Sequence, residues 1–306
     1  MSLAPHSGGV DHGCVRWRLR VAYDGSGFHG FAVQDGQRTV AGVLGEALAR
    51  VVRAPVSLTC AGRTDSGVHA LDQVVHFDVP ADAAAGLDSA ALVKSCNSQL
   101  APTVVVLEAE PVPGDFDARR SATARRYRYL VVNGPVADPL LAGLTWHVTD
   151  PLDLRSMAAA SDALLGEHDF RAFCRRVPGA DPDQPIVRRV TDTRWTELSA
   201  APGGDSPPGP DSPPGCSAPP GLAPVVGSLL TFEIEANAFC HQMVRSLVGT
   251  LVSVGQGRMT AAGVLEMLRS RDRSQGTRLA PAAGLCLQWV RYPEELVPGG
   301  VWSAPV

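Results

Sequence analysis

The chain has 306 residues, of which 45% are hydrophobic and 19% are charged, and its formal net charge is −4. This length and composition allow a sizeable hydrophobic core and exclude an intrinsically disordered protein. The sequence has no apolar run of the roughly 18 residues that a membrane-spanning helix needs. The first fourteen residues have neither the basic start nor the apolar stretch of a signal peptide, so we expect a cytoplasmic protein without membrane association.

The first half of the chain predicts the order β-α-β-β-α-β. Apolar residues alternate with arginines at 15–23, which is typical of a half-buried strand. Apolar residues spaced three and four apart at 39–52 predict a helix, with Thr39 as its N-cap. The other elements expected here are strands at 56–62, 74–79 and 103–112 and a helix at 88–100.

The second half predicts a repeat of this order, with one extra helix. Strands are expected at 126–133, 187–198, 229–237 and 284–292, and helices at 153–166, 241–255 and 260–270.

Two ferredoxin-like units in series are the simplest account of this pattern, which makes the fold α/β (α+β). We expect one unit over residues 1–114, carrying the Asp65 motif discussed below, and a second over 115–306. RNA-recognition modules use this topology with an exposed sheet face, but many unrelated proteins share it. The fold alone therefore does not determine the function.

Residues 200–224 are rich in proline and glycine and cannot form a packed core. We interpret this segment as a flexible surface insertion at the tip of a hairpin, in which Cys216 would be exposed. The alternative is a proline-rich ligand for a partner domain.

The seven cysteines form no C-x-x-C pair, and their number is odd. This pattern favours reduced thiols over a disulfide framework. The adjacent Cys240 and His241 cannot alone make a zinc site, which needs four convergent ligands. We therefore expect no metal site.

Basic residues cluster in RRSATARRYRY (119–129), which has five arginines, two tyrosines and no acidic residue. Such a local patch supplies phosphate contacts even in a protein whose net charge is negative. Because side chains alternate along a strand, not all five can face an RNA. The candidate RNA contacts are Arg119, Arg120, Arg125, Arg126 and Arg128.

Asp65 lies in the motif CAGRTDSGVHA (60–70), between glycines and two residues after Arg63. Three hypotheses compete for this aspartate. It is a turn residue bonded to its own backbone, half of the carboxylate pair of a dimeric aspartic peptidase, or a nucleophile that attacks an anomeric carbon. A nucleophile must be ionised, and Arg63 and Arg245 are the candidate guanidinium partners.

The motif, followed by DQVVHFD, resembles the catalytic motif of the tRNA pseudouridine synthase A family. Further blocks resemble the family in the same order along most of the chain. They are YDGSGFHGF (23–31), SATARRYRYLVVN (121–133), LLGEHDFRAF (164–173), ANAFCHQMVRSLVG (236–249) and APAAGLCLQWVRYP (280–293).

The resemblance implies a cofactor-independent isomerase that converts uridine to pseudouridine in the anticodon stem-loop of tRNA, at tRNA positions 38, 39 and 40. It implies that Asp65 is the nucleophile, that Arg245 pairs with it, and that Tyr127 stacks on the target base. Leu285 matches an apolar residue that packs against the nucleoside, and Arg63 would lie beside the flipped base.

The resemblance also implies a homodimer with tRNA laid across both subunits. Two alternatives stay open on the sequence alone: an RNA-binding protein on the same scaffold that lacks catalysis, and the dimeric peptidase.

Overall fold

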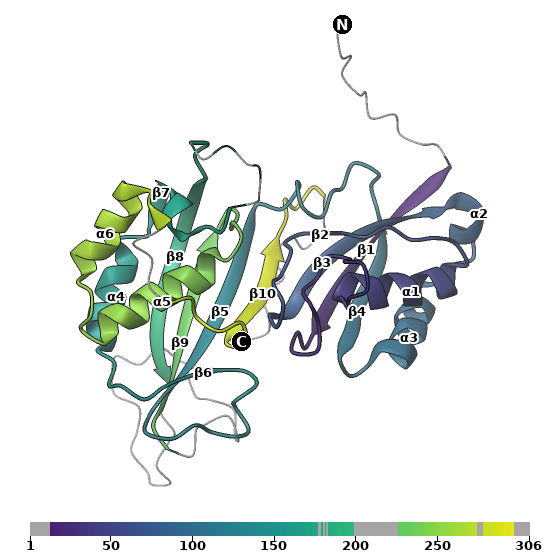
Figure 1. Cartoon of the computed structure of the whole chain (residues 1–306). Helices are drawn as coiled ribbons and strands as arrows, with labels where there is room; N and C mark the ends of the chain where they lie inside the picture. The colour runs from purple at the N-terminus through teal and green to yellow at the C-terminus, as the bar shows by residue number, and fades with distance from the viewer. Residues whose placement is uncertain are drawn as a thin grey trace, which may run out of the picture.

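A computed structural model describes residues 13–176, 179, 181, 183–198, 226–273 and 278–296 (Figure 1). The segment predicted to be an insertion, 200–224, lies outside these residues, and so does Cys216. Within the described residues, none of the helices has the length and apolar character to cross a membrane.

In the part of the chain that the structure describes, ten strands form one mixed sheet. Along the sheet the order is β4-β1-β3-β10-β5-β9-β8-β7, while β2 pairs with β3 and β6 pairs with β5. The strands are β1 (Cys14–Tyr23), β2 (Thr59–Cys60), β3 (His69–Pro80), β4 (Val104–Val112), β5 (Ala124–Asn133), β6 (Trp146–Val148), β7 (Gly166–Asp169), β8 (Val187–Leu198), β9 (Ser228–Ala236) and β10 (Leu285–Arg291).

The strand order contains one pattern twice. In the first half β1 lies between β4 and β3, and in the second half β5 lies between β10 and β9. A parallel pair of β3 and β10, with His69 opposite Cys286, joins the halves into one sheet. The predicted class, two tandem ferredoxin-like units, is confirmed. The domain boundary at residue 114 stays a prediction, because both halves share this sheet.

The helices gather in two groups beside the two ends of the sheet (Figure 1). One group lies beside the N-terminal strands and the other beside β8 and β9, while β5 and β10 lie between the groups. The helices are α1 (Val40–Val52), α2 (Ala81–Ala84), α3 (Ser89–Leu100), α4 (Leu154–Asp162), α5 (Met243–Gly255) and α6 (Ala261–Ser270), with a 3-10 helix η1 (Phe170–Phe173).

Helix starts follow the capping residues of the sequence. Thr39 caps α1 by accepting a hydrogen bond from the amide of Gly42, and Asp88 caps α3 in the same way. Such a cap stabilises a helix by about 1 kcal/mol. The helix predicted at 153–166 ends earlier, at Asp162, and the strand predicted at 74–79 begins earlier, at His69.

Strand β5 directs different side chains to the two faces of the sheet. Arg125, Tyr127 and Tyr129 are buried, whereas Arg126 and Arg128 between them are half-buried. Tyr127 lies opposite fully buried residues of both neighbouring strands, so its ring faces the core. The arginine cluster of the sequence is therefore divided between two faces.

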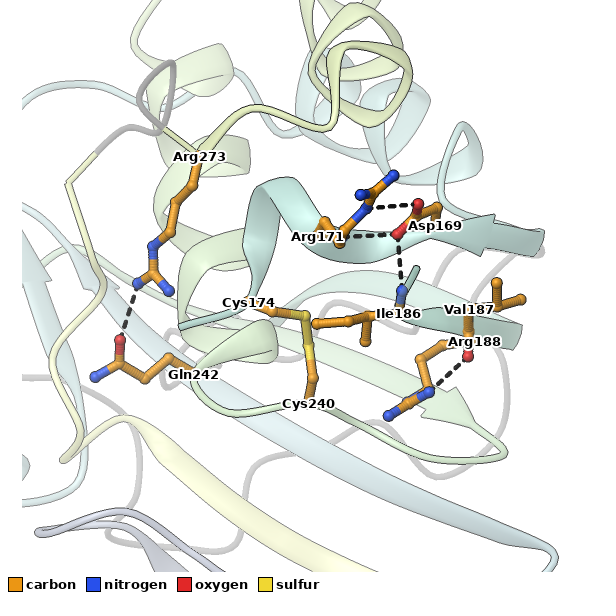
Figure 2. Close-up of a disulfide and its surroundings, with 9 residues drawn as sticks. All are labelled: Asp169, Arg171, Cys174, Ile186, Val187, Arg188, Cys240, Gln242 and Arg273. Carbon is orange, nitrogen blue, oxygen red and sulfur yellow. Dashed lines mark hydrogen bonds and ion pairs between the residues drawn. A yellow bond between two sulfur atoms is a disulfide. The ribbon is translucent and has the colours of Figure 1, made fainter. Parts of the chain in front are cut away.

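The expectation that the cysteines are reduced is wrong for two of them. Cys174 and Cys240 form a disulfide, with their Cα atoms 5.7 Å apart (Figure 2). The residues are 66 apart in sequence, so no local spacing indicates the pair. The fold brings them together because the segment after η1 lies beside the segment before α5, where the amide of Arg175 donates to the carbonyl of His241 at 2.8 Å.

Candidate active site

Asp65 lies on a loop, residues 61–68, that connects β2 to β3 and is fixed mainly by uncharged hydrogen bonds. The hydroxyls of Tyr23 and Thr64 lie 2.9 Å apart in the interior. The side chain of Gln73 donates to the carbonyl of Gly62 at 2.6 Å. These contacts are buried or partly buried, and they fix the part of the loop that directly precedes Asp65.

Two glycines of the YDGSGFHGF block allow the chain to approach this loop closely. A Cβ added to Gly25 would lie 2.0 Å from the carbonyl oxygen of Val68. Gly30 has a φ of +91° and would place a Cβ 2.9 Å from the carbonyl oxygen of Thr64. The block thus supports the loop through backbone packing that only glycine permits.

The carboxylate of Asp65 contacts two side chains from the segment around the start of α5. Arg245 Nη1 donates to Oδ2 at 3.3 Å, and His241 Nε2 lies 3.3 Å from Oδ1. The Asp65 side chain is 22% exposed, so a ligand can still reach it. The Arg245 guanidinium stabilises the negative charge of the carboxylate.

Arg63, the other candidate partner of Asp65, is exposed. In the described part of the chain it forms no ion pair with Asp65, which pairs instead with Arg245. Arg63 is itself part of the same loop. Burial raises the pKa of the Cys60 thiol to about 11, and the charge of Arg63 opposes that rise.

Tyr127 lies against the Asp65 loop. A Cβ added to Gly62 would be 3.6 Å from the phenol oxygen, and Phe239 contacts the ring edge to face at 5.0 Å. Burial raises the pKa of Tyr127; the charge of Arg125 opposes this, and that of Asp65 adds to it. The phenol is therefore uncharged at neutral pH.

Leu285 begins β10 and lies opposite Tyr129, while Leu287 lies opposite Tyr127. Residues two apart along one strand point to the same face of the sheet, and so do residues directly opposite each other on neighbouring strands. Leu285 is therefore on the same face as Tyr127. The turn before it also contacts the loop, because a Cβ added to Gly67 would lie 3.1 Å from that of Ala282.

The five arginines proposed as RNA contacts have different surroundings. Arg125 is buried and donates to four backbone carbonyls, those of Ala61, Arg119, Ala122 and Asn237. Arg126 and Arg128 both contact Glu233, and Arg126 also contacts Asp192 and Glu235. Arg119 and Arg120 are exposed.

His241 is the functional candidate that sequence reasoning missed. The sequence pattern places it beside Cys240 and indicates no role for it at Asp65. The available signal was its position four residues before Arg245 in the helix predicted at 241–255, where residues at this spacing share a face; in the structure His241 precedes the helix.

The sequence model of a family described as tRNA pseudouridine synthase matches residues 160–293. The chain is 41% identical over 285 residues to the tRNA pseudouridine synthase A of Frankia casuarinae, covering 92% of this chain and 91% of that protein. It is 41% identical over 280 residues to the Methylobacterium sp. protein of the same name, covering 91% and 98%. The Streptomyces griseus protein of this name is 38% identical over 290 residues, covering 94% and 91%. This chain, with its paired aspartate beside a buried tyrosine, belongs to the tRNA pseudouridine synthase A family of isomerases.

Proposed function

We propose that this chain converts uridine to pseudouridine in the anticodon stem-loop of tRNA, with Asp65 as the nucleophile. The observation that carries the proposal is the ion pair of Asp65 with Arg245 beside the loop that contacts Tyr127. The guanidinium attracts the carboxylate and holds it in place, and an aromatic ring offers a base a flat surface for stacking.

The reaction exchanges one bond at the ribose C1′ for another. In the proposed pathway an Asp65 oxygen bonds to C1′ while the C1′–N1 bond breaks, and the electron pair of that bond leaves with the uracil ring. The ring turns, C5 bonds to C1′, and the carboxylate is released. C5 loses a proton and N1 gains one, so the steps balance without an electron acceptor or a cofactor.

Tyr127 and Leu285 would form the wall of the nucleoside site. Stacking of a base on an aromatic side chain contributes about 1 to 3 kcal/mol. This offsets part of the cost of flipping the nucleotide, which is a few kcal/mol. The uncharged phenol of Tyr127 suits stacking, and Leu285 on the same sheet face would exclude water from the base.

Arg119 and Arg120 are the best supported of the five arginines as phosphate contacts, because their side chains are exposed. Arg63, exposed on the Asp65 loop, would lie beside the flipped base. We also propose, from family membership, that the protein acts as a cytoplasmic homodimer with tRNA laid across both subunits.

The test is incubation of the purified protein with tRNA tritiated at C5 of uridine. Isomerisation must break the C5–H bond, so we expect tritium release in proportion to pseudouridine formed at mapped positions of the anticodon stem-loop. Release at background level with tRNA still bound would identify an RNA-binding protein without catalysis. Proteolysis that pepstatin inhibits would identify the peptidase.

A further inference from the structure

The two partners of the Asp65 carboxylate contact different oxygens. Arg245 Nη1 lies 3.3 Å from Oδ2, and His241 Nε2 lies 3.3 Å from Oδ1. A carboxylate contacted at one oxygen can still rotate about its Cβ–Cγ bond. Contacts at both oxygens fix the plane of the carboxylate, and with it the direction in which each oxygen can attack.

The two partners differ in their freedom to move. Arg245 is 14% exposed, and its Nε donates to the carbonyl of Ala280 at 2.8 Å. The His241 side chain is 43% exposed. Arg245 can therefore stay on Oδ2 throughout a reaction, whereas the imidazole can turn away and uncover Oδ1.

The backbone of His241 is nevertheless fixed. We name residues 240–242 the strap. Cys240 is bonded to Cys174 by the disulfide, and the side chain of Gln242 accepts from Arg273 at 2.9 Å (Figure 2). Between them, the carbonyl of His241 accepts from the amide of Arg175 at 2.8 Å.

Gln242 also has a φ of +65°, a left-handed conformation that is unfavourable for a residue with a side chain. A strained residue persists only where its surroundings over-determine it, and such residues gather at functional sites. Each of the three residues of the strap is thus held by a disulfide or a hydrogen bond, and the strap positions the imidazole of His241 beside Asp65.

We propose that His241 is a positioning residue, which orients Oδ1 of Asp65 toward the nucleoside and leaves this oxygen only as it bonds to C1′. The inference rests on the proposed role of Asp65 as the nucleophile. The Oδ1–C1′ bond forms as the C1′–N1 bond breaks, the electron pair leaves with the uracil ring, and the imidazole keeps its proton. Arg245 remains on Oδ2 and stabilises the carboxylate again when it is released.

The test compares variants by the single-turnover rate of tritium release and by the Kd for tRNA. We expect His241→Ala to lower the rate about tenfold, since a loosely oriented nucleophile attacks less often, and to change the Kd less than about twofold. Replacement of His168, a half-buried histidine that contacts the Leu165 carbonyl, is the matched control and should leave both values unchanged.

Two amide variants separate positioning from general support of the strap. In His241→Gln the amide nitrogen takes nearly the place of Nε2, so we expect most of the rate to return. In His241→Asn the amide is too short to reach Oδ1, so the rate should stay low. This pair also carries the test if the alanine variant does not fold.

Equal single-turnover rates for wild type and His241→Ala would overturn the inference, and so would equal rates for the Gln and Asn variants. Asp65→Asn in the same assay separates this inference from the proposed function. Turnover retained by Asp65→Asn would remove the nucleophile assignment itself. An inactive Asp65→Asn with an unaffected His241→Ala would remove only the role of His241.

Discussion

The loop that carries Asp65 and the strap that carries His241 are stabilised by different interactions. The loop, residues 61–68, is fixed mainly by uncharged hydrogen bonds, by one hydrogen bond from Arg125 to Ala61, and by a backbone approach at Gly25 that leaves no room for a side chain. The strap depends on a disulfide and on a hydrogen bond from the guanidinium of Arg273.

The two halves of the chain therefore contribute differently to the site: one positions the backbone of Asp65, and the other contacts its carboxylate. The position of the Asp65 backbone is set mainly by the N-terminal half, to which Arg125 adds a hydrogen bond to the Ala61 carbonyl and Ala282 a contact with Gly67. The side chains that hold its carboxylate, His241 and Arg245, come from the C-terminal half. Changes in the loop should therefore abolish chemistry, whereas changes in the strap should weaken it.

The largest effect is expected from Asp65→Asn. The amide has the same shape but is not nucleophilic, so turnover should fall more than about 1,000-fold while the Kd for tRNA stays within about threefold. Tritium release and filter binding measure the two quantities. Residual turnover above roughly 1% of wild type, in protein that mass spectrometry finds free of deamidation, would contradict the prediction.

A smaller but still large effect is expected from Gly25→Ala. The added Cβ would lie 2.0 Å from the carbonyl oxygen of Val68, so the loop must move. We expect the free energy of unfolding to fall by about 1 to 3 kcal/mol and turnover to fall about 100-fold. Urea unfolding and tritium release measure both values.

The control for this variant is Gly45→Ala in helix α1, where the nearest atom to an added Cβ is 3.9 Å away. Alanine in a helix interior should raise the free energy of unfolding by about 0.5 to 1 kcal/mol and leave turnover unchanged. Equal behaviour of the two alanine variants would mean that the loop tolerates displacement.

Loss of the disulfide should have a moderate effect on turnover. Cys174→Ser loosens the strap but leaves the loop intact. We therefore expect turnover to fall about two- to fivefold and the free energy of unfolding to fall by about 2 to 5 kcal/mol. Reduction of the wild type should reproduce both changes. Cys14, which is exposed and unpaired, provides the serine control. A rate and stability insensitive to reduction would show that the strap does not need this bond.

The smallest effect is expected on the other face of the sheet, with Arg128→Gln. Arg128 pairs with Glu233, so its loss should change the Kd for tRNA less than about twofold. Arg120→Gln should weaken binding and reduce the slope of log Kd against log salt by about 1, because one phosphate contact is lost. The reverse order of these effects would place the RNA on the face of Arg126 and Arg128.

The sequence predicted those features of the fold that local patterns encode. Strand β8 lies at 187–198 as expected, Thr39 caps its helix as expected, and the helix predicted at 88–100 spans Ser89–Leu100. Alternation along β5 also indicated that its arginines divide between two faces, which the structure confirms. The short strands β6 and β7 were missed, because three or four residues carry too little periodicity.

Contacts between distant segments could not be predicted in this way. The pairing of Cys174 with Cys240 and the approach of His241 to Asp65 depend on how the two halves meet, not on spacing in the chain. Arg245 was identified as a partner of Asp65 only through resemblance to a family. As bare sequence, it and Arg63 were equal candidates.

The pairing of β3 with β10 has a consequence for biosynthesis. Strand β10 leaves the ribosome after every other described strand, so a nascent chain has the hydrogen-bonding groups of β3 near His69 and Ala70 uncovered until translation of residues 285–291 is complete. An unpaired strand edge of this kind invites aggregation, and a chaperone that shields it would protect the unfinished protein. Ribosomes stalled before this last strand should yield chains that cannot assemble the catalytic centre.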